Sequence, residues 1–115
     1  MAHVMDHGGE GPGAPFDVVI SQQTGCVAVY LRGELDASTA PHLEHLLGQL
    51  RHDGHHQITL DLSELAFLGA AGLGVLVRTH HDLLATGGAL VLTRPTRMVQ
   101  RILAITGLDA ALIFQ

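Results

Sequence analysis

The chain alternates between two apolar patterns: short runs rich in β-branched residues, and longer stretches in which leucines recur at helical spacing. Runs of the first kind at 57–62 and 89–93 predict strands. After Ser38, leucines spaced i, i+3, i+4 and i+7 begin at Leu43, which predicts an amphipathic helix. Because strands separated by helices join through parallel crossovers, this alternation restricts the chain to an α/β fold.

The other elements follow from local signals. Runs at 16–20 and 26–31 surround a Gln-Thr-Gly turn and predict a hairpin. Ser38 is the predicted cap of the first helix, with Pro41 in its first turn. A second helix is predicted over 70–85, with Leu73, Leu76, Val77 and Leu84 on its inner face. Pro95 opens a third helix that Gly107 ends, and a short strand over 111–114 closes the chain. We therefore expect one α/β domain, a mixed β-sheet with helices, in the order β-β-α-β-α-β-α-β.

The first fifteen residues differ in composition from the rest of the chain. Residues 1–15 hold four glycines and two prolines with almost no large apolar side chain. Such a segment cannot bury enough surface to offset its ordering entropy, so we expect a flexible N-terminal tail. The domain is then expected over residues 16–115, and a chain of 115 residues leaves room for a single core.

Composition excludes several classes of function. Eleven acidic residues against six arginines give a formal net charge of −5, which argues against a nucleic-acid partner. Apolar runs are too short to insert into a membrane, and the N-terminus lacks the pattern of a secretory signal. Cys26 is the only cysteine, so no intrachain disulfide or cysteine metal cluster can form. We expect a cytoplasmic protein.

Signals for catalysis and for ligands are weak. The nine histidines show no spacing that makes ligands converge, so we predict solvated histidines and no metal site. No Gly-rich phosphate loop carrying Lys-Ser/Thr is present, and we predict no cofactor. No Ser-His-Asp spacing or paired carboxylates suggest catalytic residues, so the chain is not expected to be an enzyme. Recognition of a partner is the function that remains.

Three segments carry a resemblance to a known family. Gly33-Glu34-Leu35-Asp36 precedes the first helix, residues 60–63 and 67–74 (LDLS and FLGAAGLG) lead into the second, and Thr106-Gly107-Leu108 follows the third. In this order they resemble the STAS domain of bacterial anti-sigma-factor antagonists, over about residues 16–114. Such a domain is a protein-binding module that regulates transcription.

The resemblance also implies a mechanism and a departure from it. In the antagonist family the second helix begins with a sequence like Asp-Ser-Ser/Thr-Gly-Leu. The first Ser is phosphorylated by the partner, an anti-sigma factor that is also a serine kinase. The unphosphorylated antagonist binds that partner and frees a sigma factor. By position, the acid maps to Gly69 and the phosphoacceptor to Ala70. Because Ala70 has no hydroxyl, control by phosphorylation at this position is not expected.

Eight residues are implied to bind the partner. The resemblance brings the loop after the second strand beside the start of the second helix, which implicates Glu34, Asp36, Ser38, Gly69, Ala70, Ala71, Gly72 and Leu73. Asp36 also suits the turn into the first helix, and the small residues at 69–72 also suit close backbone packing.

The leading hypothesis is an anti-sigma-factor antagonist that binds a serine-kinase-type anti-sigma factor, with no nucleic acid and no direct membrane insertion. A homodimer or association with another STAS protein stays open. One alternative is a STAS subunit of a membrane transport complex. Another is a regulatory module that binds a nucleotide or a second STAS protein.

Overall fold

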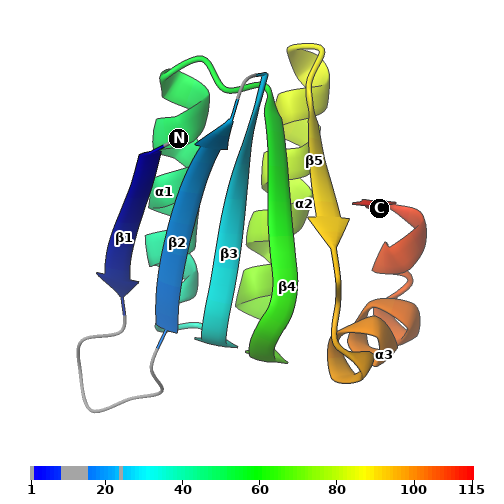
Figure 1. The fold of residues 1–115 in the computed structure, drawn as a ribbon. Helices are drawn as coiled ribbons and strands as arrows, with labels where there is room; N and C mark the ends of the chain where they lie inside the picture. The colour runs from blue at the N-terminus through cyan, green and yellow to red at the C-terminus, as the bar shows by residue number, and fades with distance from the viewer. Residues whose placement is uncertain (1, 9–15, 24) are drawn as a thin grey trace.

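A computed structural model describes residues 2–8, 16–23 and 25–115 (Figure 1). Within these residues six strands form one sheet in the order β1-β2-β3-β4-β5-β6. Their bounds are β1 Ala2–Gly8, β2 Phe16–Gln23, β3 Cys26–Leu35, β4 Gln57–Leu68, β5 Ala89–Thr93 and β6 Ile113–Phe114. The first three strands pair antiparallel, and β3 through β6 pair parallel. The predicted mixed sheet is confirmed.

Helices provide the crossovers between the parallel strands. They are α1 (Ala40–His52), α2 (Ala70–Ala85) and α3 (Arg97–Thr106), followed by a short 3₁₀ turn over Leu108–Ala110. In Figure 1, α1 and α2 lie side by side behind the sheet, which leaves its other face towards the viewer. From Phe16 onward the element order matches the predicted α/β arrangement.

Strand β1 corrects one prediction. Residues Ala2–Gly8 lie within the segment expected to be a flexible tail, yet they pair antiparallel with β2 along its whole length. The expectation rested on the few apolar side chains of this segment. An edge strand is held by backbone hydrogen bonds, which do not require such side chains. Residues 9–15 of the expected tail lie outside the described residues.

The core lies between the sheet and its helices. Alternate residues of the strands are buried on the helix side, and Leu43, Leu47 and Leu50 of α1 pack against them as predicted. On α2 the prediction is partly wrong, because Leu84 is 50% exposed and Leu83 is buried instead. The buried positions of α2 are 72, 73, 75, 76, 79, 80 and 83, and Leu84 lies about 100° further round the helix than Leu83, beyond the edge of this stripe.

None of the helices in the described part of the chain combines the length and the apolar character needed to cross a bilayer.

Candidate functional site

The predicted site residues come together where β3 and β4 end and α1 and α2 begin. The two strands run parallel, and Leu35 pairs in register with Leu68 at their carboxyl ends. The backbone N–H of Gly69 donates to the carbonyl oxygen of Leu35 at 2.9 Å, which joins the two connections directly. Residues 34–38, from the end of β3 into the connection to α1, and residues 69–71, the N-cap and first residues of α2, therefore form one surface, called here the helix-start surface.

The connection into α1 is held by side-chain hydrogen bonds. One carboxylate oxygen of Asp36, Oδ1, accepts from the Ser38 hydroxyl at 2.7 Å and from the backbone N–H groups of Ser38 and Thr39 at 2.9 and 3.1 Å. The Ser38 hydroxyl bond, aided by these backbone N–H groups, holds the pKa of Asp36 below its usual value although desolvation opposes the shift. Asp36 is thus an ionised, pre-ordered acceptor at the surface.

The start of α1 also corrects the predicted cap. Thr39, not Ser38, is the N-cap residue, and it makes no side-chain bond to the helix. Its hydroxyl instead donates to the carbonyl oxygen of Glu34 at 2.8 Å and accepts from the N–H of Asp36 at 2.9 Å. Thr39 is only 1% exposed, so these bonds tie the loop to the body of the protein from within.

The connection into α2 has no side-chain bond of this kind. Its N-cap residue is Gly69, which makes no side-chain cap. Ala70 and Ala71 are exposed, whereas Gly72 and Leu73 are buried. A β-carbon on Gly72 would lie 2.6 Å from Cγ of Leu35, closer than atoms can pack. Gly72 and Leu73 therefore shape the helix-start surface from inside, and the methyl groups of Ala70 and Ala71 face outward.

A shallow hollow of about 300 Å³ separates the two helix starts. It is lined by Ala37, Ala40, Pro41, Glu44, Ala70, Ala71, Gly74, Val75 and Arg78. Arg78 makes an ion pair with Glu44 across the hollow, with nitrogen–oxygen distances of 3.0 and 3.1 Å. Both side chains are more than half exposed, so the pair contributes little to stability. Most of the lining residues have small or apolar side chains, although the exposed area of the lining is more polar than apolar. Ala70 offers no oxygen to receive a phosphoryl group.

Phe67 borders this surface and was not among the predicted site residues. It is the penultimate residue of β4, it pairs in register with Glu34, and it is 42% exposed. A β-carbon on Gly69 would lie 3.1 Å from Cε2 of Phe67, so the ring rests against that glycine. No sequence pattern indicates this exposure, because an aromatic residue in an apolar run is more often part of a core.

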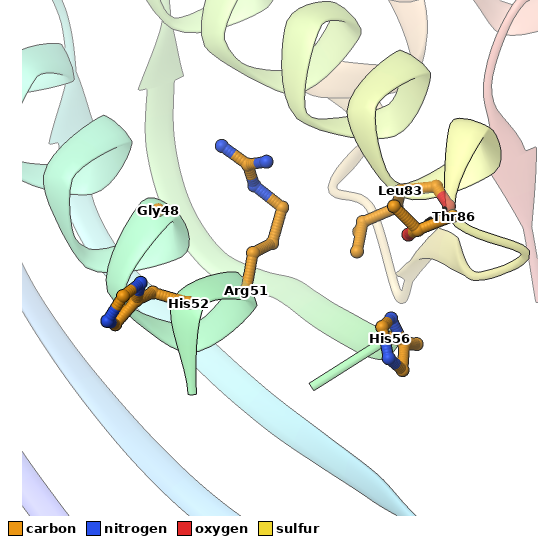
Figure 2. Close-up of a pocket in the computed structure, with 6 residues that line it drawn as sticks. All are labelled: Gly48, Arg51, His52, His56, Leu83 and Thr86. Carbon is orange, nitrogen blue, oxygen red and sulfur yellow. Dashed lines mark hydrogen bonds between the residues drawn. The ribbon is translucent and has the colours of Figure 1, made fainter. Parts of the chain in front are cut away.

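A second hollow lies at the opposite ends of α1 and α2 (Figure 2). It measures about 350 Å³ and is lined by Gly48, Arg51, His52, His56, Leu83 and Thr86. Arg51 forms an ion pair with Asp82 at 3.4 Å, and Figure 2 shows the imidazoles of His52 and His56 lying apart from its guanidinium. The basic groups that line this hollow do not converge on one point.

The histidines do not gather around a common point either. Within residues 2–8, 16–23 and 25–115, no three His, Cys, Asp or Glu side chains are placed to hold a metal ion together. His80 departs from the predicted solvated state, since it is only 4% exposed on α2. Burial, together with the neighbouring His81, lowers the pKa of His80.

Comparison with known proteins decides the family. The sequence model of the STAS domain family matches residues 17–115 of this chain, which is nearly the whole described domain. The chain belongs to the STAS domain family. This confirms the resemblance that the motifs indicated.

Related proteins of this STAS domain share one description. An anti-sigma-B factor antagonist of Staphylococcus aureus is 34% identical over 80 residues, which cover 70% of this chain and 74% of that protein. The crystal structure of an anti-sigma factor antagonist from Mycobacterium paratuberculosis superposes with a TM-score of 0.78 at 28% identity, covering 86% of this chain and 84% of the other. The anti-sigma factor antagonist SpoIIAA in its unphosphorylated form superposes with a TM-score of 0.74, covering 85% of this chain and 87% of the other; at 20% identity this likeness concerns the fold.

Proposed function

We propose that this STAS domain binds an anti-sigma factor and thereby frees a sigma factor, as a binding module and not as an enzyme. The contact is made by the helix-start surface, through Glu34, Asp36, Ser38, Gly69, Ala70 and Ala71, with Gly72 and Leu73 supporting it from below. The observation that carries this proposal is the joining of the ordered Asp36 loop to the exposed α2 start by the Gly69–Leu35 hydrogen bond. A relative that is 34% identical bears the description of an anti-sigma-B factor antagonist.

We further propose that phosphorylation at position 70 plays no part in this binding. Alanine offers no hydroxyl there, and the nearest hydroxyls along the chain are poorly available. Ser63 is half-buried and its hydroxyl donates to Asp61 at 2.6 Å, and Thr79 is only 5% exposed. A partner of the serine-kinase type would therefore bind this domain without switching it off at the α2 start.

A sigma-release assay tests the proposal. Each anti-sigma factor encoded in the genome of origin is purified in complex with its sigma factor, and this protein is added with and without prior incubation with ATP. We expect one complex to release its sigma factor, measured as restored transcription, with no effect of ATP. Release from none of the complexes would contradict the proposal. Stable co-purification with a membrane permease instead would favour the transport-subunit alternative.

Mass spectrometry of the same samples checks the second part. We expect no phosphate on peptides that cover residues 61–79. Stoichiometric phosphate on Ser63 or Thr79, or on Ser38 in the adjoining loop, would show that control by phosphorylation persists at another residue.

A further inference from the structure

Two aromatic side chains of similar exposure lie in different surroundings. Phe67 is 42% exposed and Tyr30 is 40% exposed. Tyr30 lies between the buried Val29 and Leu31 on β3, so alternation along the strand puts it on the sheet face away from the helices. Phe67 lies at the carboxyl end of β4, next to the helix-start surface. An exposed aromatic ring beside a candidate contact surface is the kind of residue that dominates binding energy at protein interfaces.

The ring of Phe67 lies against Gly69, two residues further along the chain. Gly69 has no side chain, and its missing β-carbon would lie 3.1 Å from ring atom Cε2 and 3.6 Å from Cζ. The backbone of Gly69 is extended, with φ of −98°, so its conformation does not demand glycine. The absence of a side chain instead lets the ring lie against the start of α2. Phe67 and Gly69 thus form one apolar contact, and the exposed methyl groups of Ala70 and Ala71 follow Gly69 directly in the chain.

The groups around this apolar contact are mainly acidic. Glu34 at the end of β3 and Asp36 in the connection into α1 flank it, and Glu44 lies across the hollow. Arg78 is the basic residue that lines the hollow, and its charge is matched by its ion pair with Glu44. Two carboxylates, Glu34 and Asp36, against one exposed arginine, Arg32, leave this edge with a net negative charge that can attract a partner's basic side chains.

We infer that Phe67 is the apolar anchor of the helix-start surface, and that it fits a partner surface with an apolar pocket edged by arginine or lysine. The inference rests on the proposed function, because it takes the anti-sigma factor as the protein that carries this pocket. It goes beyond that function by naming the anchoring side chain and the chemistry of the partner's contact.

Binding measurements on matched variants test this inference. Each purified anti-sigma factor of the genome of origin is titrated with the wild-type protein and with Phe67→Ala, Phe67→Leu and Tyr30→Ala. For the factor that binds, we expect Phe67→Ala to weaken affinity at least about tenfold and Phe67→Leu to weaken it less. Tyr30→Ala, which removes an equally exposed ring from the sheet face, is expected to stay within about twofold. The melting temperature of each variant confirms that it is folded.

Two further measurements address Gly69 and the acidic edge. Gly69→Ala puts a β-carbon against the Phe67 ring, so we expect it to weaken binding by a smaller factor than Phe67→Ala. Raising the salt concentration screens the acidic edge, so affinity is expected to fall several-fold between low and high ionic strength.

The outcomes separate this inference from the proposed function. Wild-type affinity in a folded Phe67→Ala protein, or equal losses in Phe67→Ala and Tyr30→Ala, would overturn the anchor role while the proposed function stands. Affinity that does not change with salt would overturn the basic edge of the partner. Failure of every anti-sigma factor to bind the wild-type protein would overturn both proposals.

Discussion

The connections from β3 into α1 and from β4 into α2 lie side by side but are held in different ways. At the first, Asp36 and Thr39 fix the chain through hydrogen bonds to hydroxyl and backbone groups. At the second, Gly69 and Gly72 let the backbone pack directly against Leu35 and Phe67, and no side-chain cap is present. The first connection is held by hydrogen bonds, and the second is held by close packing of the backbone at its glycines.

The first connection keeps the acidic residue that the family resemblance predicts, whereas the second connection does not. The Asp36 loop keeps an ionised acceptor, so it can still contribute charge to a contact. The α2 start holds Gly69 and Ala70 where the resemblance implies an acid and a hydroxyl, so it presents the methyl groups of Ala70 and Ala71, with the ring of Phe67 beside Gly69. We therefore propose that a partner would contact the second connection through apolar packing. Variants of the first connection should lose hydrogen bonds, and variants of the second should lose close packing.

Gly72→Leu should have the largest effect on stability. A β-carbon at Gly72 would lie 2.6 Å from Cγ of Leu35 and 2.9 Å from Cδ1 of Leu68, so a leucine overfills the core. We expect a loss of about 3 kcal/mol in the free energy of unfolding, measured by denaturant titration. Gly48→Ala is the control, because no atom lies within 4 Å of its β-carbon position on α1; it should gain about 0.5–1 kcal/mol. Equal effects of the two substitutions would contradict the close packing.

The fold was largely predictable, because it follows from periodicity. Alternation of strand and helix patterns gave the element order from Phe16 onward, and Gly107 adopts the left-handed conformation expected of a helix C-cap. The errors have local causes. Strand β4 runs on to Leu68, past the predicted end at Leu62, because parallel pairing with β3 continues there in spite of two register shifts. Such pairing depends on contacts between distant segments, which a local pattern does not contain.

Thr39→Val should remove the hydrogen bonds that hold the connection from β3 into α1. Valine keeps the size of threonine but cannot donate to the carbonyl oxygen of Glu34 or accept from the N–H of Asp36. Because this site is buried, we expect a loss of about 1–2 kcal/mol in unfolding free energy. Thr39→Ser keeps the hydroxyl and should lose less. A Val variant as stable as the wild-type protein would mean that the loop is held by packing, like its neighbour.

Because of Asp36, the stability of the folded protein should fall at acidic pH. Its pKa is lowered in the folded state, chiefly by the Ser38 hydroxyl bond, so its stabilising effect is present above its ordinary pKa of 3.8 and is lost as pH falls through the lowered value. In thermal unfolding followed against pH, Asp36→Asn should lose less stability than the wild-type protein in this acidic range. Ser38→Ala, which removes the main cause of the shift, should lie between them. Identical pH profiles for all three proteins would contradict this role.

The site was less predictable than the fold. The motifs brought Asp36 and Ala70 to one surface, and helical spacing put Leu73 on the inner face of α2, where it is buried. Sequence spacing did not reveal that Phe67 is exposed. The exposure of Phe67 depends on how the end of β4 and the start of α2 are oriented relative to each other. That orientation is set by the contact of Gly72 with Leu35, two residues that are far apart in the sequence.

The smallest change in stability should come from Ala70→Glu, and this variant tests the central claim most directly. A carboxylate at the N-terminus of α2 interacts favourably with the helix dipole, so the fold should be unchanged or more stable by about 0.3–1 kcal/mol. In a complex the same charge would be buried without a partner, at a cost of several kcal/mol. Arg101→Glu, an exposed change on α3, serves as the control. In titration calorimetry with the anti-sigma factor identified by sigma release, we predict that Ala70→Glu loses binding and Arg101→Glu keeps it. Undiminished affinity of a folded Ala70→Glu protein would contradict the assignment of the helix-start surface as the binding face.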